Sequence, residues 1–268
     1  MPPFRPSLPL LLTTFTIVVP TTSILLATYL YTRPLPLPKQ RMISINDGLS
    51  HSFATSPHDH SLKIVNPKSH TARTDSRSIT LLRSSISKSK SGSEEEVGDE
   101  EILARYLRGY FGGWSFAPER ILLSGFSMIG RKLIPVGFSE MPATGPEVQK
   151  LEGISKVNLP AKGSLLFGGN FIVLDIHLAS SGSESWEKVP EKDSSEISYV
   201  DVGFGDDRKK FAGMHRFEIQ HHFAKEEKDE KEEKGEEEVR IWYSSLSCNP
   251  SIDRPLFWDW AFALHRRV

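Results

Sequence analysis

The sequence predicts an α+β domain, in which an antiparallel sheet packs with helices, preceded by one transmembrane helix and a disordered tether. No residue between Pro6 and Thr32 is charged, and the chain from Arg33 to Gly98 is rich in Ser, Pro, Lys and Arg. From Asp99 onward, apolar residues recur first with the period of a helix and then with that of a strand. The expected boundaries are an anchor at 1–32, a linker at 33–98 and a globular domain at 99–268.

The uncharged N-terminal segment predicts membrane insertion. Leu8–Tyr31 is mostly Leu, Ile, Val, Thr and Ala, and it is about as long as a bilayer core requires. A cleaved signal peptide is the alternative, although the apolar run is long for one. Arg33, Lys39 and Arg41 follow the run while only Arg5 precedes it, and basic residues stay on the cytoplasmic side. We therefore expect a single-pass protein with the lipid bilayer as its partner and the domain in the cytoplasm.

Composition and motif spacing argue against several classes of function. The net charge is -1 and no segment shows a basic and aromatic strand pattern, so nucleic acid is not an expected partner. Cys248 is the single cysteine, which excludes an intramolecular disulfide and agrees with a reducing compartment. The segment Gly203-Phe-Gly205 lacks the spacing of a phosphate loop and predicts a tight turn instead. We expect neither a cofactor nor a metal site.

Helices open the expected domain. Asp99 suits an N-cap, and apolar residues from Ile102 to Phe111 form one helical stripe that ends at a pair of glycines. A second helix is expected to begin at Pro118, because proline suits the first helical turn. The following residues 128–142 are apolar but interrupted by Gly and Pro, which predicts irregular structure.

Strands fill the second half of the domain. In Phe171–Leu178, period-two alternation places Ile172, Leu174 and Ile176 on one face. Further strands are expected at Tyr199–Phe204, His215–Phe223 and Val239–Leu246, the last two as an antiparallel hairpin.

Two segments complete the expected domain. A run at 225–238 is almost wholly Lys and Glu, which predicts a flexible, charged low-complexity insertion within the hairpin. Residues 256–268 have apolar side chains spaced by four, which predicts an amphipathic C-terminal helix.

Three segments carry a family resemblance. Tyr199-Val-Asp-Val-Gly-Phe-Gly205, Phe211-Ala-Gly-Met-His-Arg-Phe217 and the strand from Val239 to Cys248 resemble an uncharacterised fungal family of membrane-anchored proteins. They are more distantly similar to a plant and actinobacterial domain family of unknown function. Where that distant family has Gly-Glu-Glu-x-Phe, this chain has Gly213-Met-His-Arg-Phe217, so a role of those acids does not transfer. The resemblance implies no established activity.

A few residues are candidates for chemistry or ligand binding. Asp175 and His177 project from the same face of one expected strand, and His215 approaches from another, as an acid and base pair requires. His215 shares its face with Phe217 and Ile219, which predicts an imidazole among apolar side chains. The candidates are His215, His177 and Asp175 for catalysis, and Trp242, Phe217 and Ile219 for lining an apolar pocket.

Two classes of function follow from these observations. The first is a membrane-tethered module that binds an apolar small molecule or lipid. The order of helices, antiparallel strands and terminal helix is similar to the helix-grip layout, in which a curved sheet wraps a helix around a cavity. The second is a small tethered enzyme of the cyclase or dehydratase type, using His and Asp as acid and base. A scaffold without a ligand is the third alternative.

Overall fold

The structure of the chain is a computed structural model. It describes residues 43–256 apart from 47, 56–59, 87–96, 114–115, 129, 180–196 and 223–237. The expected anchor, nearly all of the charged insertion and nearly all of the C-terminal helix therefore lie outside the described residues. Within the described residues, no helix has both the length and the apolar character needed to span a bilayer.

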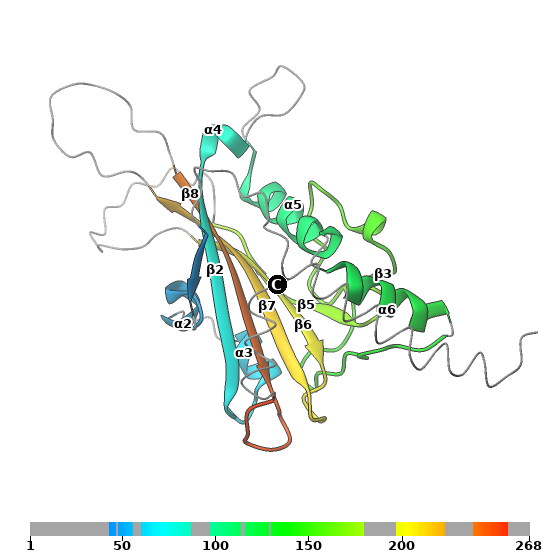
Figure 1. The fold of residues 1–268 in the computed structure, drawn as a ribbon. Coiled ribbons are helices and arrows are strands. Elements are labelled where there is room, and N and C mark those ends of the chain that lie inside the picture. The colour runs from blue at the N-terminus through cyan, green and yellow to red at the C-terminus, as the bar shows by residue number, and fades with distance from the viewer. Residues whose placement is uncertain are drawn as a thin grey trace, which may run out of the picture. The chain divides into compact units, whose positions relative to one another are not determined.

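One sheet of eight strands forms the centre of the described part (Figure 1). The strand order is β1-β2-β8-β7-β6-β5-β4-β3, and neighbouring strands are antiparallel except for β3 and β4. The strands are β1 (Ser44–Asn46), β2 (Ala72–Leu82), β3 (Glu147–Val148), β4 (Leu165–Leu166), β5 (Phe171–His177), β6 (Ile197–Gly205), β7 (Ala212–His222) and β8 (Glu238–Cys248). The sheet confirms the predicted α+β class, and the pairing of β7 with β8 confirms the predicted hairpin.

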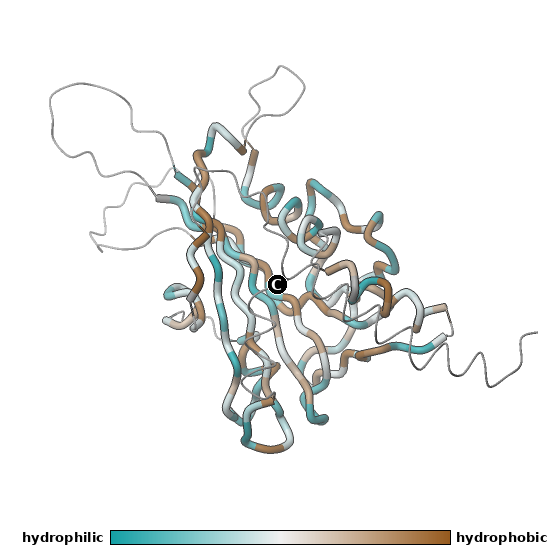
Figure 2. Tube along the Cα trace, viewed as in Figure 1, coloured by the Kyte–Doolittle hydropathy of each residue, from teal (hydrophilic) through white to brown (hydrophobic). Residues whose placement is uncertain are grey.

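Helix α5 (Asp99–Gly112) covers the face of the sheet that carries Val200, Phe217 and Ile219, called here the α5 face. Its apolar stripe is buried as predicted, and Leu107 is fully enclosed. Figure 2 shows that apolar residues recur along this helix and along the strands beneath it. The predicted N-cap was wrong by one position, because Gly98 occupies it and Asp99 is the first helical residue.

Helix α6 (Ala117–Met128) follows α5, starting one residue before the predicted Pro118. Residues 130–142 beyond it contain no long helix or strand among those the structure describes, as the glycines and prolines predicted. A single 3-10 turn, η1 (Leu151–Gly153), packs beside α5.

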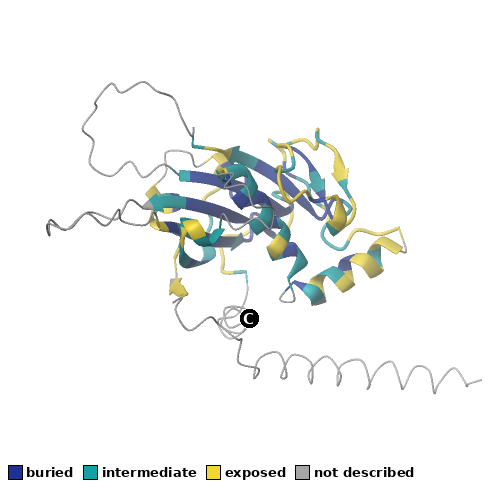
Figure 3. Ribbon diagram, turned by 90° about the horizontal axis from the view of Figure 1, so that it is seen from above, coloured by how far each residue is buried: buried dark blue, intermediate teal, exposed yellow. Residues whose placement is uncertain are grey.

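Two short helices cover the opposite face of the sheet, called here the α3 face. They are α2 (His51–Thr55) and α3 (His60–Val65). Phe53 and Ile64 pack there with Met214 and Leu246 from the central strands. The sheet is therefore covered on both faces, and Figure 3 shows its strands as largely buried.

The largest difference between the structure and the sequence-based prediction lies in residues 33–98, which we expected to be a disordered linker. It contains β1, α2, α3, β2 and a further short helix, α4 (Arg83–Ile86). Strand β2 pairs with β8 along its whole length, from Ala72 opposite Cys248 to Leu82 opposite Glu238. Its sequence is mostly polar, so backbone hydrogen bonds of the ladder, rather than apolar side chains, hold it in the sheet. The domain begins near residue 43 and not at 99.

A bulge in β5 overturns the predicted alternation there. Val173 pairs with Val202 but Asp175 pairs with Asp201, so Leu174 is an extra residue on this strand. Leu174 packs on the α3 face, whereas Ile176 beyond the bulge packs on the α5 face. A single inserted residue reverses the face of every later side chain.

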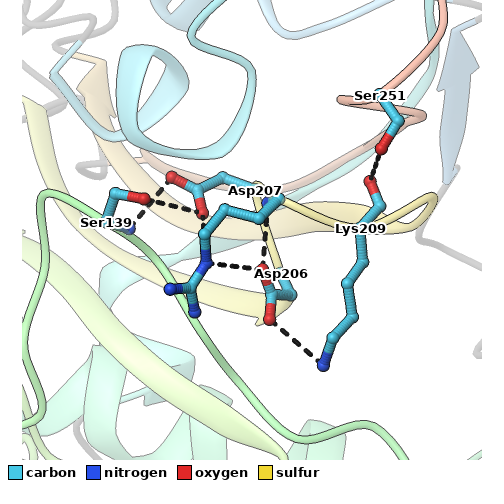
Figure 4. A network of polar contacts seen from close by, with 6 residues as sticks. Ser139, Asp206, Asp207, Lys209 and Ser251 are labelled. Atoms are coloured by element: carbon cyan, nitrogen blue, oxygen red, sulfur yellow. Dashed lines mark hydrogen bonds and ion pairs between the residues drawn. The ribbon is translucent and has the colours of Figure 1, made fainter.

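Two acidic residues, Asp206 and Asp207, lie in the turn between β6 and β7 and accept backbone hydrogen bonds there (Figure 4). The Asp206 carboxylate accepts the backbone N–H of Arg208 at 2.9 Å, and the Asp207 carboxylate accepts the backbone N–H of Ser139 at 2.9 Å. Gly205 has φ of +82°, and a Cβ there would lie 2.3 Å from the carbonyl oxygen of Phe211. The tight turn predicted from the glycines is confirmed.

Candidate functional site

His215 lies on β7 beneath α5 and is enclosed by aromatic rings. Its side chain is buried, with 8% of the residue exposed. The ring centroids of Phe204, Tyr243 and Tyr110 lie 4.8, 5.4 and 5.5 Å from the imidazole. The sequence predicted this histidine among apolar residues of the α5 face, and the structure places it there.

A chain of hydrogen bonds runs from this imidazole to helix α5. The Tyr243 hydroxyl lies 2.8 Å from Nδ1 of His215, and the Tyr110 hydroxyl lies 3.0 Å from that of Tyr243. If Nδ1 carries no proton, Tyr243 donates to it and Tyr110 donates to Tyr243. If Nδ1 is protonated, the direction of both hydrogen bonds reverses. The chain can therefore adopt either direction of hydrogen bonding without moving a heavy atom.

Both tyrosines are neutral at physiological pH. Burial raises the pKa of Tyr110 to about 12, although the hydrogen bond from Tyr243 opposes the rise. Burial raises the pKa of Tyr243 well above its usual range, and the neighbouring Tyr110 adds to this. The two hydroxyls consequently act as hydrogen-bond donors and acceptors rather than as anions.

Strand β2 brings two charged residues to the same region. Asp75 pairs with Ser245, which pairs on its other side with His215, so all three side chains stand on the α5 face. Arg77 stands beside Tyr243 in the same way. We name the group of Tyr110, His215, Tyr243, Asp75 and Arg77 the Tyr-His cluster.

The sequence-based reasoning missed four members of this cluster. Asp75 and Arg77 lie on β2, which has no apolar alternation and falls within the predicted linker. Tyr243 had a signal, since period two places it on one face with Val239 and Ile241. Tyr110 also lay in the predicted helical stripe, but as a core residue only.

Asp175 and His177 share one face, as predicted, but it is the α3 face. The Asp175 carboxylate accepts hydrogen bonds from Lys162 Nζ at 2.8 Å and from the Tyr199 hydroxyl at 3.1 Å. The exposed His177 stacks on the Tyr199 ring at 5.5 Å. Since His215 belongs to the opposite face, the structure does not bring the three predicted catalytic candidates together.

The three predicted pocket residues are also divided between the faces. Phe217 and Ile219 are fully buried beneath α5. Trp242 lies on the α3 side of β8, where its indole N–H donates to the Gln220 side chain at 3.0 Å. Trp242 therefore cannot share a ligand with Phe217 or Ile219 across the sheet.

A second polar group lies at the start of α5. Nε2 of His221 is 2.9 Å from one carboxylate oxygen of Asp99, and the Ser198 hydroxyl donates to the other at 2.5 Å. Burial raises the pKa of Asp99, but the hydrogen bonds from His221 and Ser198 outweigh burial and lower it. Because Ser198 bonds to the acid and not to the imidazole, the three residues do not form the relay of a serine hydrolase.

The described residues include no group of His, Cys, Asp and Glu placed to hold a metal ion. Cys248 is buried, and burial raises its pKa to about 12, which makes it unreactive as a nucleophile. No family model, no curated protein and no solved structure matches the chain.

Proposed function

We propose that this protein is a single-pass membrane protein whose cytoplasmic domain binds an apolar small molecule or lipid on the α5 face. The hydrogen-bonded chain of Tyr110, Tyr243 and His215 is the observation that carries the proposal. It places polar atoms among aromatic rings, which is the composition of a site for an apolar ligand with a polar group.

The polar atoms of the Tyr-His cluster suit a ligand group that accepts hydrogen bonds. Each hydroxyl is hydrogen-bonded within the chain, which offsets the free-energy cost of burying it, and each keeps hydrogen-bonding capacity for a polar ligand group. Burial raises the pKa of both tyrosines, so the hydrogen-bonded chain is enclosed together with the imidazole.

The layout supports the same proposal. A long helix lies across one face of an antiparallel sheet, an arrangement similar to the helix-grip layout, in which ligands bind between the helix and the sheet. The Tyr-His cluster lies on that side of the sheet. The likeness concerns layout alone, so the polar residues carry the argument for function.

Native mass spectrometry of the full-length protein released from detergent tests the proposal. We expect wild-type protein to carry a copurifying molecule as added mass. Tyr243→Phe removes the hydroxyl that joins the chain, and we expect about tenfold weaker retention, the equivalent of one hydrogen bond. Trp242→Phe is the matched control, because it changes the neighbouring residue on the opposite face. Wild-type protein without added mass, or equal retention by both variants, would contradict the proposal.

A tethered enzyme with acid–base chemistry is the second candidate function. The observation that favours it is the His221 and Asp99 pair, since a carboxylate that orients an imidazole is a common catalytic arrangement. The two candidate functions make different predictions for a substitution of His221. Replacement of His221 with Gln abolishes turnover of the copurifying molecule if the enzyme proposal holds, and leaves its retention unchanged if the domain only binds.

A further inference from the structure

Helix α6 presents an unusual apolar surface to solvent. Ile121, Leu122 and Met128 have exposed fractions of 72%, 54% and 88%. Leu123 is the one side chain described on this helix that is buried in the core. Figure 3 shows α6 as mostly exposed, in contrast to the strands. Clustered large apolar side chains on a surface indicate a contact with a partner or a membrane.

The charges around α6 are arranged unevenly. No residue from Ile121 to Gly130 is charged, and Arg131 and Lys132, both exposed, follow at once. At the other end, Glu119 is exposed in the first turn, and the Arg120 guanidinium donates to the carbonyl oxygens of Phe111 and Gly113, so the charge of Arg120 faces the domain. An apolar helix surface with basic residues beside it is typical of helices that lie in the interface of an anionic membrane.

The length of the tether argues for a bilayer as the occupant of this surface. The sheet begins at Ser44, so about 11 residues separate it from Thr32, and an extended chain of that length spans at most roughly 40 Å. An anchor within residues 8–31 would therefore keep the domain at the membrane surface. At such proximity even a weak contact is occupied most of the time.

We propose that α6 lies on the anionic surface of the membrane that holds the anchor. Ile121, Leu122 and Met128 enter the boundary between head groups and acyl chains, and Arg131 and Lys132 contact the head groups. The inference rests on the anchoring part of the proposed function. It adds a second membrane contact, which fixes the orientation of the domain at the bilayer.

A fluorescent probe on α6 tests this contact in the full-length protein. Cys248 is buried, so Met128→Cys provides a thiol that an environment-sensitive dye can label selectively. The matched control is Val157→Cys, on a loop position with an exposed fraction of 53%. In proteoliposomes of phosphatidylcholine and phosphatidylserine that contain a spin-labelled quencher lipid, we expect several-fold stronger quenching at position 128 than at position 157.

Charge reversal provides the second measurement. Arg131→Glu combined with Lys132→Glu should reduce the quenching at position 128 to the level of the control. Equal quenching at the two positions in the unreversed protein overturns the inference. A dye response that depends on protein concentration but not on the quencher lipid also overturns it, because it assigns the surface to a second copy of the chain. Carbonate extraction of the same vesicles tests the anchor separately, since loss of anchoring releases the protein whereas failure of the α6 contact does not.

Discussion

The guanidinium of Arg216 on β7 donates two hydrogen bonds, each 2.7 Å long, to the carboxylate of Asp201 on β6. Both side chains are almost fully buried on the α3 face. The guanidinium carbon lies 3.8 Å from the ring centre of Phe53 and 4.0 Å from that of Tyr199. Phe53 belongs to α2, so a buried ion pair in the sheet contacts a helix from the segment that the sequence presented as a linker.

The first prediction concerns this ion pair. Arg216→Met leaves the Asp201 carboxylate buried without its cation, and we expect a loss of about 3–5 kcal/mol in the free energy of unfolding. The stability of Arg216→Lys should lie between that of this variant and that of wild type, because Lys keeps the charge but cannot make the bidentate hydrogen bonds to Asp201. Urea denaturation in detergent measures both. A loss below about 1 kcal/mol for Arg216→Met would show that the pair is not a net stabilising contact.

The second prediction concerns Glu218, on the same face as the ion pair. It is buried, it accepts a hydrogen bond from the Ser50 hydroxyl at 3.3 Å, and burial raises its pKa. A raised pKa means that the fold favours the protonated acid, so its stability contribution falls as pH rises above the unfolded value of about 4.5. Glu218→Gln should therefore gain stability relative to wild type with rising pH, by about 1.4 kcal/mol for each unit of the shift.

Parallel unfolding measurements between pH 4 and pH 8 check the prediction for Glu218. The control is Glu140→Gln, at an exposed position. Curves for wild type and Glu218→Gln that stay parallel over this range would argue against a raised pKa in the fold.

The third prediction concerns Asp99, which joins the start of α5 to His221 on β7 and Ser198 on β6. Burial raises its pKa, but these hydrogen bonds outweigh burial and lower it. The stabilisation is therefore present above the unfolded value of 3.8 and is lost as pH falls through the folded value. At pH 7, Asp99→Asn should cost about 1–3 kcal/mol, because a charged acceptor is lost at a helix N-terminus.

Its control is Glu101→Gln in the same helical turn, which removes a charge but leaves the contacts to His221 and Ser198 intact. The difference between wild type and Asp99→Asn should shrink in acid. A stability difference that stays constant from pH 7 to pH 3 would show that packing, and not the carboxylate charge, accounts for the contribution of Asp99.

The elements that the sequence predicted well are those with apolar periodicity. Helix α5 buries one regular apolar stripe, and strands β6, β7 and β8 carry apolar residues with period two on the α5 face, so their existence and type followed from the sequence. Strand β2 carries Asp75, Ser76 and Ser78 as buried residues, so no periodic signal marks it. It is in the sheet because β8 offers it a complete ladder, which is a tertiary cause that the local sequence does not contain.

The same cause limited what the sequence could say about the site. His215 was predicted to point inward because its own strand is regular. Its neighbours across the sheet, Asp75 and Arg77, come from the strand that the sequence did not reveal. The expected meeting of His215 with Asp175 failed for a geometric reason, since side chains on opposite faces of a sheet cannot meet.

The last prediction compares two glycines with opposite expected effects. A Cβ on Gly213 in β7 would lie 2.3 Å from the Phe204 ring and 2.5 Å from the carbonyl oxygen of Leu246. Gly109, on the exposed side of α5, would meet nothing within 4 Å. Gly213→Ala should therefore destabilise by about 1–3 kcal/mol through overpacking. Gly109→Ala should stabilise by roughly 0.5–1 kcal/mol, because alanine favours a helix interior.

Gly213 also connects this comparison to the Tyr-His cluster. The Phe204 ring that a methyl group at 213 would displace is the ring that lies 4.8 Å from His215. Gly213→Ala should thus weaken retention of a copurifying ligand as well as stability, whereas Gly109→Ala should change stability alone. Thermal unfolding and native mass spectrometry on both variants measure the two effects. Unchanged retention in a folded Gly213→Ala protein would mean that the packing of Phe204 against His215 does not shape the site.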